Sequence, residues 1–493
     1  MRSIKRRDFL RLSAGTTTAM LLSQCSRSQP LSSAPVSEPI QFQTYKSKNG
    51  LLSLDLEAKA QSVQLGSRTA NLLAYNGKVP GPLLEANAGD RVQIRFTNQL
   101  NQPTNVHYHG LHIPPTGSGD NVFLEISPGE SHTYEYQIPD THPAGTFWYH
   151  PHKHGLVAEQ LFAGLAGLFI VRGELDEIPE IKAAKEEFLV LKDFALDSNG
   201  NISETGHMTA MTGRAGGLLT ASGQINPRMT IQRGGLLRLR LLNASPSRFF
   251  RLSLEDHPMH LIATDGGAIS SPTELSDVVL APGERVEVLV QGNQAPNSYR
   301  LINQPFNPAQ GGMMGGMMSR NQSSDSAETV ATLTYEGETD EMPLPSQLIA
   351  VEPLPEPQTT RQFTLNHGMG GGGMMGGGGM MGNGMVFMIN GKAFDPARVD
   401  TQVMLNTVED WEVTNTGSMV HPFHVHTNKF QIISQGGRPT PYPTWKDVVP
   451  VSPRETVRIR MAFRDYVGKT VYHCHVLDHE DRGMMGILEI QQA

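Results

Sequence analysis

Apolar and polar residues alternate in short runs along most of the chain. Three pairs of such runs lie at 91–96 and 132–136, at 236–242 and 286–290, and at 411–413 and 457–461. A period of two residues is typical of half-buried β-strands, because successive side chains point to opposite faces of a sheet. Turns rich in Gly, Pro and Asn stand before these runs, and the whole pattern predicts an all-β fold.

The same succession of turns and strands recurs at intervals of about 130 to 180 residues, a spacing typical of domains rather than of short repeats. It predicts three related Greek-key β-sandwich domains. We expect an export leader and linker at 1–36, and domains at 37–173, 174–345 and 346–493. Gly173 and the Pro- and Glu-rich stretch 341–358 mark the boundaries between the domains.

The charge and composition exclude several classes of protein. The net charge of the 493 residues is −8, and the 18% that are charged form no basic patch, which argues against nucleic-acid binding. No run of about 20 apolar residues could span a membrane. Of the two Cys residues, Cys25 falls in or beside the leader, so Cys474 has no partner for an intrachain disulfide.

The N-terminus has the features of an export leader. Residues 5–11, Lys-Arg-Arg-Asp-Phe-Leu-Arg, resemble a twin-arginine signal, and a weakly apolar stretch follows at 12–22. A basic tail is the alternative. The twin-arginine route carries folded proteins to the periplasm. Lipid attachment at Cys25 is disfavoured, because Gln24 is not the small residue normally found before such a Cys.

The last strand carries the strongest chemical signal. It reads Tyr-His-Cys-His-Val-Leu-Asp-His at 472–479. Because side chains alternate along a strand, Cys474 points to one face, and His473 and His475 point to the other. Five His-x-His pairs occur in the chain, whereas 18 His residues in 493 predict about 0.7 such pairs by chance. One strand can therefore bind metal on both faces and connect the two sites.

One face of this strand predicts a blue copper site. Cys474, His421 and His479 supply a thiolate and two imidazoles, and Met484 follows as a weak thioether ligand. This is the donor set of a blue-copper electron-transfer site. A core methionine beside Met485 is the alternative interpretation of Met484.

The remaining paired histidines predict a second metal centre. They are His107, His109, His150, His152, His424, His426, His473 and His475. Eight imidazoles exceed the capacity of one metal ion, and the first and third domains each supply four, so we expect a cluster between these domains. Imidazole suits copper, and no carboxylate recurs in the motifs, which argues against di-iron.

These motifs closely resemble those of the multicopper oxidases. The matching segments are 107–110, 148–152, 421–426 and 473–484. The resemblance implies three cupredoxin domains and a copper oxidase that takes electrons singly at a type 1 copper and reduces O₂ to water at a trinuclear cluster. It assigns His107 and His424 to a type 2 copper. It assigns a type 3 pair to His109, His150, His152, His426, His473 and His475.

Other histidines admit alternative interpretations. His154 competes with His150 as the partner of His152, and the family pattern favours His150. His257 and His260 mimic the third motif without a downstream His-Cys-His, so we expect them to bind no metal. The others are expected to be solvated or locally hydrogen-bonded, namely His112, His132, His142 and His207.

Two carboxylates are candidates for proton delivery, which O₂ reduction requires. Asp120 follows the first motif, Glu480 follows His479, and both match acidic positions that the family uses for this purpose. Ordinary surface carboxylates are the alternative. Together with Cys474 as the electron carrier, these two residues are the expected catalytic residues.

Two tracts of Gly and Met, at 311–318 and 368–385, cannot pack a core and are expected to be loops. Their thioethers are soft donors that suit Cu(I). The donors of the second tract are Met369, Met374, Met375, Met380, Met381 and Met385. The resemblance then narrows to a cuprous-oxidase branch that carries a Met-rich insert over the type 1 site. That branch has an acidic ligand where Gly417 stands here, whereas Met419 matches a methionine ligand.

We therefore expect an exported, monomeric copper oxidase with Cu(I) as the favoured substrate, phenols or diamines as further substrates, and a role in copper tolerance. The nearest alternative is a general laccase with organic substrates. Two non-enzymatic alternatives are a copper-sequestering protein and a copper-free scaffold for protein interactions. The complete set of imidazoles counts against both.

Overall fold

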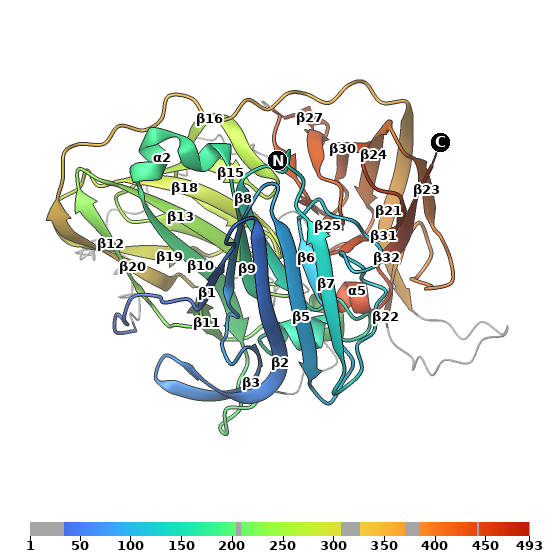
Figure 1. Cartoon of the computed structure of the whole chain (residues 1–493), viewed down its shortest axis with the longest axis horizontal. Coiled ribbons are helices and arrows are strands. Elements are labelled where there is room, and N and C mark those ends of the chain that lie inside the picture. The colour runs from blue at the N-terminus through green and yellow to red at the C-terminus, as the bar shows by residue number, and fades with distance from the viewer. Residues whose placement is uncertain (1–33, 204–208, 307–325, 370–384, 441–442, 493) are drawn as a thin grey trace, which may run out of the picture. The chain divides into compact units, whose positions relative to one another are not determined.

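The computed structural model describes residues 34–203, 209–306, 326–369, 385–440 and 443–492. Several predictions fall outside these ranges, namely most of the export leader with Cys25, His207, the first Met tract, and Met374, Met375, Met380 and Met381. Within the described ranges, six β-sheets form three pairs, each enclosing its own apolar core. Figure 1 shows these strands in chain order, from blue through green and yellow to red.

The first sandwich packs a sheet of order β3-β2-β5-β7 against one of order β1-β4-β9-β8-β6. Its strands are β1 (Thr44–Lys46), β2 (Leu51–Leu65), β3 (Arg68–Tyr75), β4 (Leu83–Asn87), β5 (Arg91–Gln99), β6 (His107–His109), β7 (Ser131–Gln137), β8 (Gly145–His150) and β9 (Gly167–Arg172). Helix α1 (Val157–Phe162) lies between β8 and β9 in the chain. The predicted alternation holds on β5, where Val92, Ile94 and Phe96 are buried in the core.

The second sandwich packs a sheet of order β11-β10-β13-β18-β15-β16 against one of order β12-β20-β19-β14-β17. Its strands are β10 (Lys185–Phe194), β11 (Leu218–Ala221), β12 (Arg228–Arg233), β13 (Leu236–Asn243), β14 (Phe250–Leu254), β15 (Met259–Thr264), β16 (Gly267–Leu275), β17 (Val278–Leu280), β18 (Arg285–Gln291), β19 (Ser298–Asn303) and β20 (Glu328–Glu338), and its helices are η2 (Glu174–Glu177), α2 (Pro179–Ala183) and α3 (Thr209–Thr212).

Strand β13 is buried on both faces. Leu239 belongs to the core, while Arg238 and Arg240 on the opposite face pair with Glu287. Arg240 also donates a hydrogen bond to the Thr146 hydroxyl of β8, at 3.0 Å. The charged face of β13 therefore packs against the first sandwich rather than facing solvent.

The third sandwich packs a sheet of order β22-β21-β24-β30-β26-β27, in which β28 also pairs with β26, against one of order β23-β32-β31-β25-β29. Its strands are β21 (Thr359–Met369), β22 (Met385–Ile389), β23 (Thr401–Met404), β24 (Thr407–Asn415), β25 (His421–Val425), β26 (Phe430–Gln435), β27 (Arg438–Pro439), β28 (Trp445–Lys446), β29 (Val448–Val451), β30 (Thr456–Phe463), β31 (Gly468–Cys474) and β32 (Met485–Gln491), and helix α5 (Leu477–Asp481) follows β31.

The prediction of an all-β fold built from three β-sandwiches is confirmed. Strand register brings the histidine motifs together within each sandwich. His107 of β6 lies opposite His150 of β8, and His424 of β25 lies opposite His473 of β31. In the ranges that the structure describes, none of the helices is long and apolar enough to cross a membrane.

Candidate metal centres

Cys474 ends strand β31 in the core of the third sandwich, with two imidazoles beside its thiol. His421 begins the neighbouring strand β25, and His479 lies in α5, the short helix after β31. The Sγ atom of Cys474 lies 3.4 Å from Nδ1 of His421 and 3.7 Å from Nδ1 of His479, and the two Nδ1 atoms are 3.2 Å apart. All three side chains are fully buried. Three donors thus converge as a trigonal metal site requires.

The chain returns Met484 to this site by a tight turn after α5. The Cys474 amide donates a hydrogen bond to the Met484 carbonyl at 3.0 Å, and the Met484 amide donates to the His479 carbonyl at 2.9 Å. The Met484 side chain is buried in the same core cluster as Cys474. This placement suits the weak thioether of a blue copper site.

Burial controls the protonation of the donors around Cys474. It raises the pKa of the Cys474 thiol, and it lowers the pKa of His421 and of His479, the latter to about 3. The imidazoles are therefore neutral and able to bind metal at neutral pH. A thiol in such a pocket becomes a thiolate when a bound metal ion balances its charge. The donor set and its surroundings fit copper.

The second sandwich holds the far side of the His479 ring. Nε2 of His479 donates a hydrogen bond to the Met211 carbonyl in α3, at 2.9 Å. This bond leaves Nδ1 as the nitrogen with the free lone pair, which is the one that faces Cys474. Arg214 of the same segment pairs with Asp478, the residue before His479, at 2.9 Å. The second sandwich therefore fixes both the tautomer and the position of His479.

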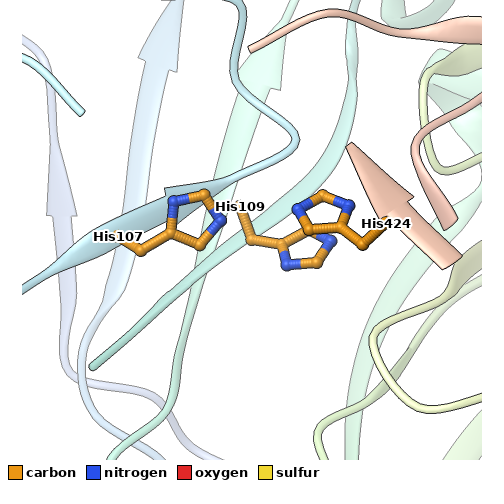
Figure 2. A group of neighbouring side chains, drawn as sticks. All are labelled: His107, His109 and His424. Atoms are coloured by element: carbon orange, nitrogen blue, oxygen red, sulfur yellow. The ribbon is translucent and has the colours of Figure 1, made fainter. Parts of the chain in front are cut away.

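Imidazoles from the first and third sandwiches meet in three all-histidine groups, and the donor atoms of each group lie within 4.8 Å of one another. The groups are His109, His150 and His475; His152, His426 and His473; and His107, His109 and His424. Figure 2 shows the last group, in which His424 of the third sandwich stacks on His109 of the first with ring centroids 3.9 Å apart. The structure thus brings together all eight paired histidines.

The ring nitrogens of this cluster are of two kinds. Some are held by oxygen atoms: Nδ1 of His107 lies 2.8 Å from Asp120, and Nδ1 of His424 donates to the Asp447 carbonyl at 2.7 Å. Others are buried without a hydrogen-bond partner in the described part of the chain, such as Nε2 of His107, His424 and His475. Buried polar atoms are almost always paired, so unpaired nitrogens in a cluster indicate metal ligands.

Burial, and then repulsion between neighbouring rings, lowers the pKa of these imidazoles, among them His107 and His424. The rings are therefore neutral donors at neutral pH. Neutral imidazoles with one nitrogen fixed by a protein oxygen are the usual form of copper-binding histidines. This cluster also fits copper.

Both predicted carboxylates are buried against the histidine cluster. The two oxygens of Asp120 lie 2.8 and 2.9 Å from Nδ1 of His107. The oxygens of Glu480 lie 3.1 Å from Nδ1 of His473 and 3.6 Å from Nε2 of His152. Burial raises the pKa of Asp120 to about 8 and that of Glu480 to about 7. Carboxyl groups with pKa values near neutrality are suited to transfer protons.

A third carboxylate, which no sequence motif marks, connects the cluster to the second sandwich. A carboxylate oxygen of Asp447 lies 3.0 Å from Nε2 of His109, and the backbone carbonyl of Asp447 accepts a hydrogen bond from His424. Arg285, at the start of β18, donates to both Asp447 oxygens at 2.7 and 2.6 Å. Its Nε donates to the Thr146 carbonyl of the first sandwich at 3.0 Å. All three sandwiches therefore meet beside the cluster.

Other predicted residues lie apart from these groups. His154 contacts Phe394, with ring centroids 4.5 Å apart, and Nε2 of His257 lies 2.7 Å from the Tyr335 hydroxyl. Among the described residues, neither of these histidines nor His260 joins a group of three potential ligands.

Two methionines of the predicted Cu(I) site lie at the core of the third sandwich. Met419 is fully buried in it, and Met385 packs against it from β22. Met369 ends β21 opposite Met385. His367, two residues earlier on β21, is a further potential donor that the motifs did not reveal. Its only signal in the sequence is its position directly before the second Met tract.

Comparison with known proteins indicates one family for this chain. Three family models described as Multicopper oxidase match residues 57–176, 186–338 and 357–493. The chain is 29% identical over 455 residues to the multicopper oxidase mco of Staphylococcus haemolyticus, with 90% of each chain covered. It is 30% identical over 440 residues to the cell division protein FtsP of Xenorhabdus nematophila, with 87% of each chain covered.

A solved structure leads to the same family. The multicopper oxidase from Campylobacter jejuni, described as a metallo-oxidase, is 30% identical to this chain, with a TM-score of 0.79 and coverage of 93% of this chain and 96% of that chain. The three sandwiches are cupredoxin-like, as the resemblance implied. This chain belongs to the multicopper oxidase family and is a copper-dependent oxidoreductase.

Proposed function

We propose that this protein oxidises Cu(I), and also phenols and diamines, in one-electron steps and reduces O₂ to water. The main support for the proposal is the position of strand β31 between the two groups of potential ligands. Its Cys474 faces His421 and His479, whereas His473 and His475 belong to two different groups of the histidine cluster. When bound, copper supplies one-electron transfer at the Cys474 centre and four-electron reduction of O₂ at the cluster. The backbone of β31 links these two centres through adjacent residues.

The proposed ligands are those that the resemblance to the multicopper oxidases implies, and the groups of converging donors support them. Cys474, His421 and His479 would hold the type 1 copper through Sγ and the two Nδ1 atoms, and Met484 would supply a weak thioether donor. His107 and His424, whose Nε2 atoms are unpaired within the described residues, hold the type 2 copper. The type 3 pair is held by two groups, His109, His150 and His475, and His152, His426 and His473.

Asp120 and Glu480 are the proposed proton carriers, and they serve different parts of the cluster. Asp120 touches His107, a proposed type 2 ligand. Glu480 touches His152 and His473, two proposed type 3 ligands. The raised pKa of each carboxyl lets it hold a proton near neutral pH and deliver it where O₂ is reduced.

Cu(I) is the favoured substrate because soft donors belong to the same sandwich core as Cys474. Met385 and Met419 lie around the same core, and the second Met tract joins β21 to β22. Thioethers select Cu(I) over harder ions. We further propose that the protein has a role in copper tolerance. It is exported as a monomer to the periplasm by the twin-arginine route, and its domains span 37–173, 174–345 and 346–493.

A copper-free scaffold is a second candidate, since one relative that is 30% identical is named a cell division protein. The convergence of unpaired, buried imidazole nitrogens favours the oxidase, because a scaffold gains nothing from buried donors without partners.

The decisive experiment measures O₂ uptake by the copper-loaded protein with Cu(I) and with a phenol. We expect a blue protein that oxidises both. The Cys474→Ser variant should lose the blue colour and both activities while retaining copper in the histidine cluster. A colourless wild-type protein with a full copper load would rule out the type 1 site. A blue protein that oxidises the phenol but not Cu(I) would be a laccase with organic substrates.

The contribution of the Met tract is tested separately. Deletion of 370–384 removes the thioethers of Met374, Met375, Met380 and Met381. We expect the ratio of Cu(I) oxidation to phenol oxidation to fall. An unchanged ratio would show that these thioethers do not select the substrate.

A further inference from the structure

A cavity of about 270 Å³ lies between the first and third sandwiches, and none of the residues that line it is a proposed copper ligand. The first sandwich contributes the loop between β7 and β8. The third contributes the loop between β25 and β26, strand β28 and the end of β30. Interfaces between domains are common places for small-molecule sites, so the chemistry of this lining indicates what the cavity could bind.

Two histidines line the cavity, but their ring nitrogens are already used. Nδ1 of His112 donates a hydrogen bond to the Thr427 carbonyl at 2.8 Å, and its Nε2 lies 3.0 Å from the Asp465 carboxylate. Nε2 of His142 accepts a hydrogen bond from the His112 amide at 3.1 Å, and its Nδ1 donates to the Pro143 carbonyl at 3.0 Å. Asp465 is the one carboxylate among the described lining residues, and His112 therefore occupies it.

Two other basic side chains at the cavity have no carboxylate partner. Within the described residues, neither Lys429 nor the exposed Arg464 forms an ion pair. Nζ of Lys429 has only a long contact of 3.4 Å with the Gly266 carbonyl, and it lies 5.8 Å from the centre of the Trp445 ring. Burial lowers the pKa of Lys429 to about 7, although the nearby Asp447 opposes this shift. An anion in the cavity would stabilise the charged ammonium group.

The side-chain amide of Asn428 is a third group without a partner. The residue is 2% exposed, and in the described chain both its Oδ1 and its Nδ2 are buried without a hydrogen-bond partner. Leaving a buried amide unpaired is costly, so its N–H group is a candidate donor to a ligand oxygen. An ammonium, a guanidinium and an amide N–H group therefore line one cavity without an acceptor.

The remaining wall of the cavity is largely apolar and is formed by Pro139, Pro143, Leu354, Trp445 and Ala462. A carbon skeleton would cover this surface, whereas an inorganic anion would leave it without a partner. We propose that the cavity binds a small organic carboxylate, whose oxygens accept hydrogen bonds from Arg464, Lys429 and Asn428. A guanidinium fork matches the geometry of a carboxylate, and the Trp445 ring supports the carbon skeleton. The inference concerns a binding site apart from both proposed copper centres.

The test uses benzoate as the probe and copper-loaded protein, so that the resident copper sites are filled. Titration calorimetry measures the affinity of wild type, Arg464→Met and Lys429→Met for benzoate. Loss of one charge-assisted contact should weaken binding roughly tenfold or more. Benzyl alcohol lacks the charge and inorganic phosphate lacks the carbon skeleton, so both should bind wild type more weakly than benzoate does. Copper content and blue colour should be the same in all three proteins.

Arg438 provides a matched control. It is an exposed arginine on β27 of the same sandwich and does not line the cavity. Arg438→Met removes the same charge and should keep the wild-type affinity for benzoate. Tryptophan fluorescence tests the location, because Trp148 and Trp411 are fully buried, whereas Trp445 is partly exposed at the cavity. Benzoate should change the fluorescence of wild type and have much less effect on Trp445→Phe.

The outcomes decide both the site and the class of ligand. If wild type binds no benzoate, or if Arg464→Met and Lys429→Met bind it as tightly as wild type, the inference is wrong. Equal weakening in Arg438→Met would also overturn it, since the effect would then reflect net charge rather than the cavity. Tighter binding of phosphate than of benzoate would rule out an organic carboxylate. None of these measurements involves oxidation, so their failure would leave the proposed function standing.

Discussion

Replacing Gly283 by alanine should displace a proposed copper ligand, although Gly283 lies in the second sandwich, which contains none of the proposed ligands. Gly283 has a φ of +84° in the turn before β18. A Cβ atom there would lie 2.9 Å from both Cδ2 and Nε2 of His475 and 3.0 Å from Cε1. Real Cβ contacts are essentially never this short, so the imidazole must move. Both nitrogens of His475 lack hydrogen-bond partners in the described chain, so only packing opposes this movement.

The first sandwich supplies a matched control, Gly129, in the same Pro-Gly-Glu turn. Its φ is +83°, and a Cβ atom there would meet nothing within 4 Å. The amide of Gly129 donates to the Asn98 carbonyl at 2.7 Å, and that of Gly283 to the Asn243 carbonyl at 2.9 Å. Both alanine variants therefore share the cost of a left-handed backbone, about 1–2 kcal/mol. Only Gly283→Ala adds the overpacking, about 1–3 kcal/mol.

Denaturant unfolding of the copper-free proteins measures the stability difference between the two variants. Copper analysis after dialysis against a chelator measures the effect on the histidine cluster. We expect Gly283→Ala to bind cluster copper roughly 10–100-fold more weakly. The blue colour should remain, since the Cys474 donors are not touched. If Gly283→Ala matches Gly129→Ala in both stability and copper content, the argument from the contact with His475 is wrong.

Further variants test the buried charges. Arg285→Met leaves the buried Asp447 carboxylate without its arginine and should lower the free energy of unfolding, measured in denaturant, by about 3–5 kcal/mol. Arg300→Met, which breaks the partly exposed pair with Glu255, should lower it by about 1 kcal/mol or less. Equal losses of stability would refute the distinction between buried and exposed pairs. Burial lowers the pKa of Lys192 from 10.5 to about 7, so the unfolded chain binds more protons between these values. The stability of wild type relative to Lys192→Met should therefore fall by about 1.4 kcal/mol per unit as the pH drops from 10 to 7, and parallel profiles would contradict this. Asp120→Asn and Glu480→Gln should lower turnover by about 10²–10⁴ while copper content and colour persist, and wild-type turnover in both would place the proton path elsewhere.

The fold could be predicted because its signal is local. The alternation of Val92, Ile94 and Phe96 on β5 needs only the period of a strand and one buried face. The same reasoning fails on β13, where Arg238 and Arg240 suggest a solvent-facing side. They are buried because another sandwich covers them, and the sequence of one strand contains no information about that neighbour.

The candidate site could likewise be predicted only in part from the sequence. The alternation of His473, Cys474 and His475 separates Cys474 from its two neighbours, so both centres could be inferred from it. The predicted strand at 472–479 is wrong beyond Cys474, because β31 ends there and α5 begins at Leu477. Asp447 and Arg285 are 162 positions apart and belong to no motif. Their pairing depends on how the second and third sandwiches pack, which is determined by three-dimensional contacts rather than by spacing.

The second sandwich holds none of the three-residue potential metal groups found in the described chain, yet both proposed copper centres contact it. The Met211 carbonyl fixes His479, and the turn at Gly283 packs against His475. Arg285 neutralises Asp447, which is fully buried beside His109. A buried carboxylate without a counter-charge would favour a protonated imidazole, and a protonated imidazole cannot bind copper. The first and third sandwiches alone would therefore bring the proposed ligands together but leave His109 beside a carboxylate without a counter-charge, so the second sandwich is part of the proposed site.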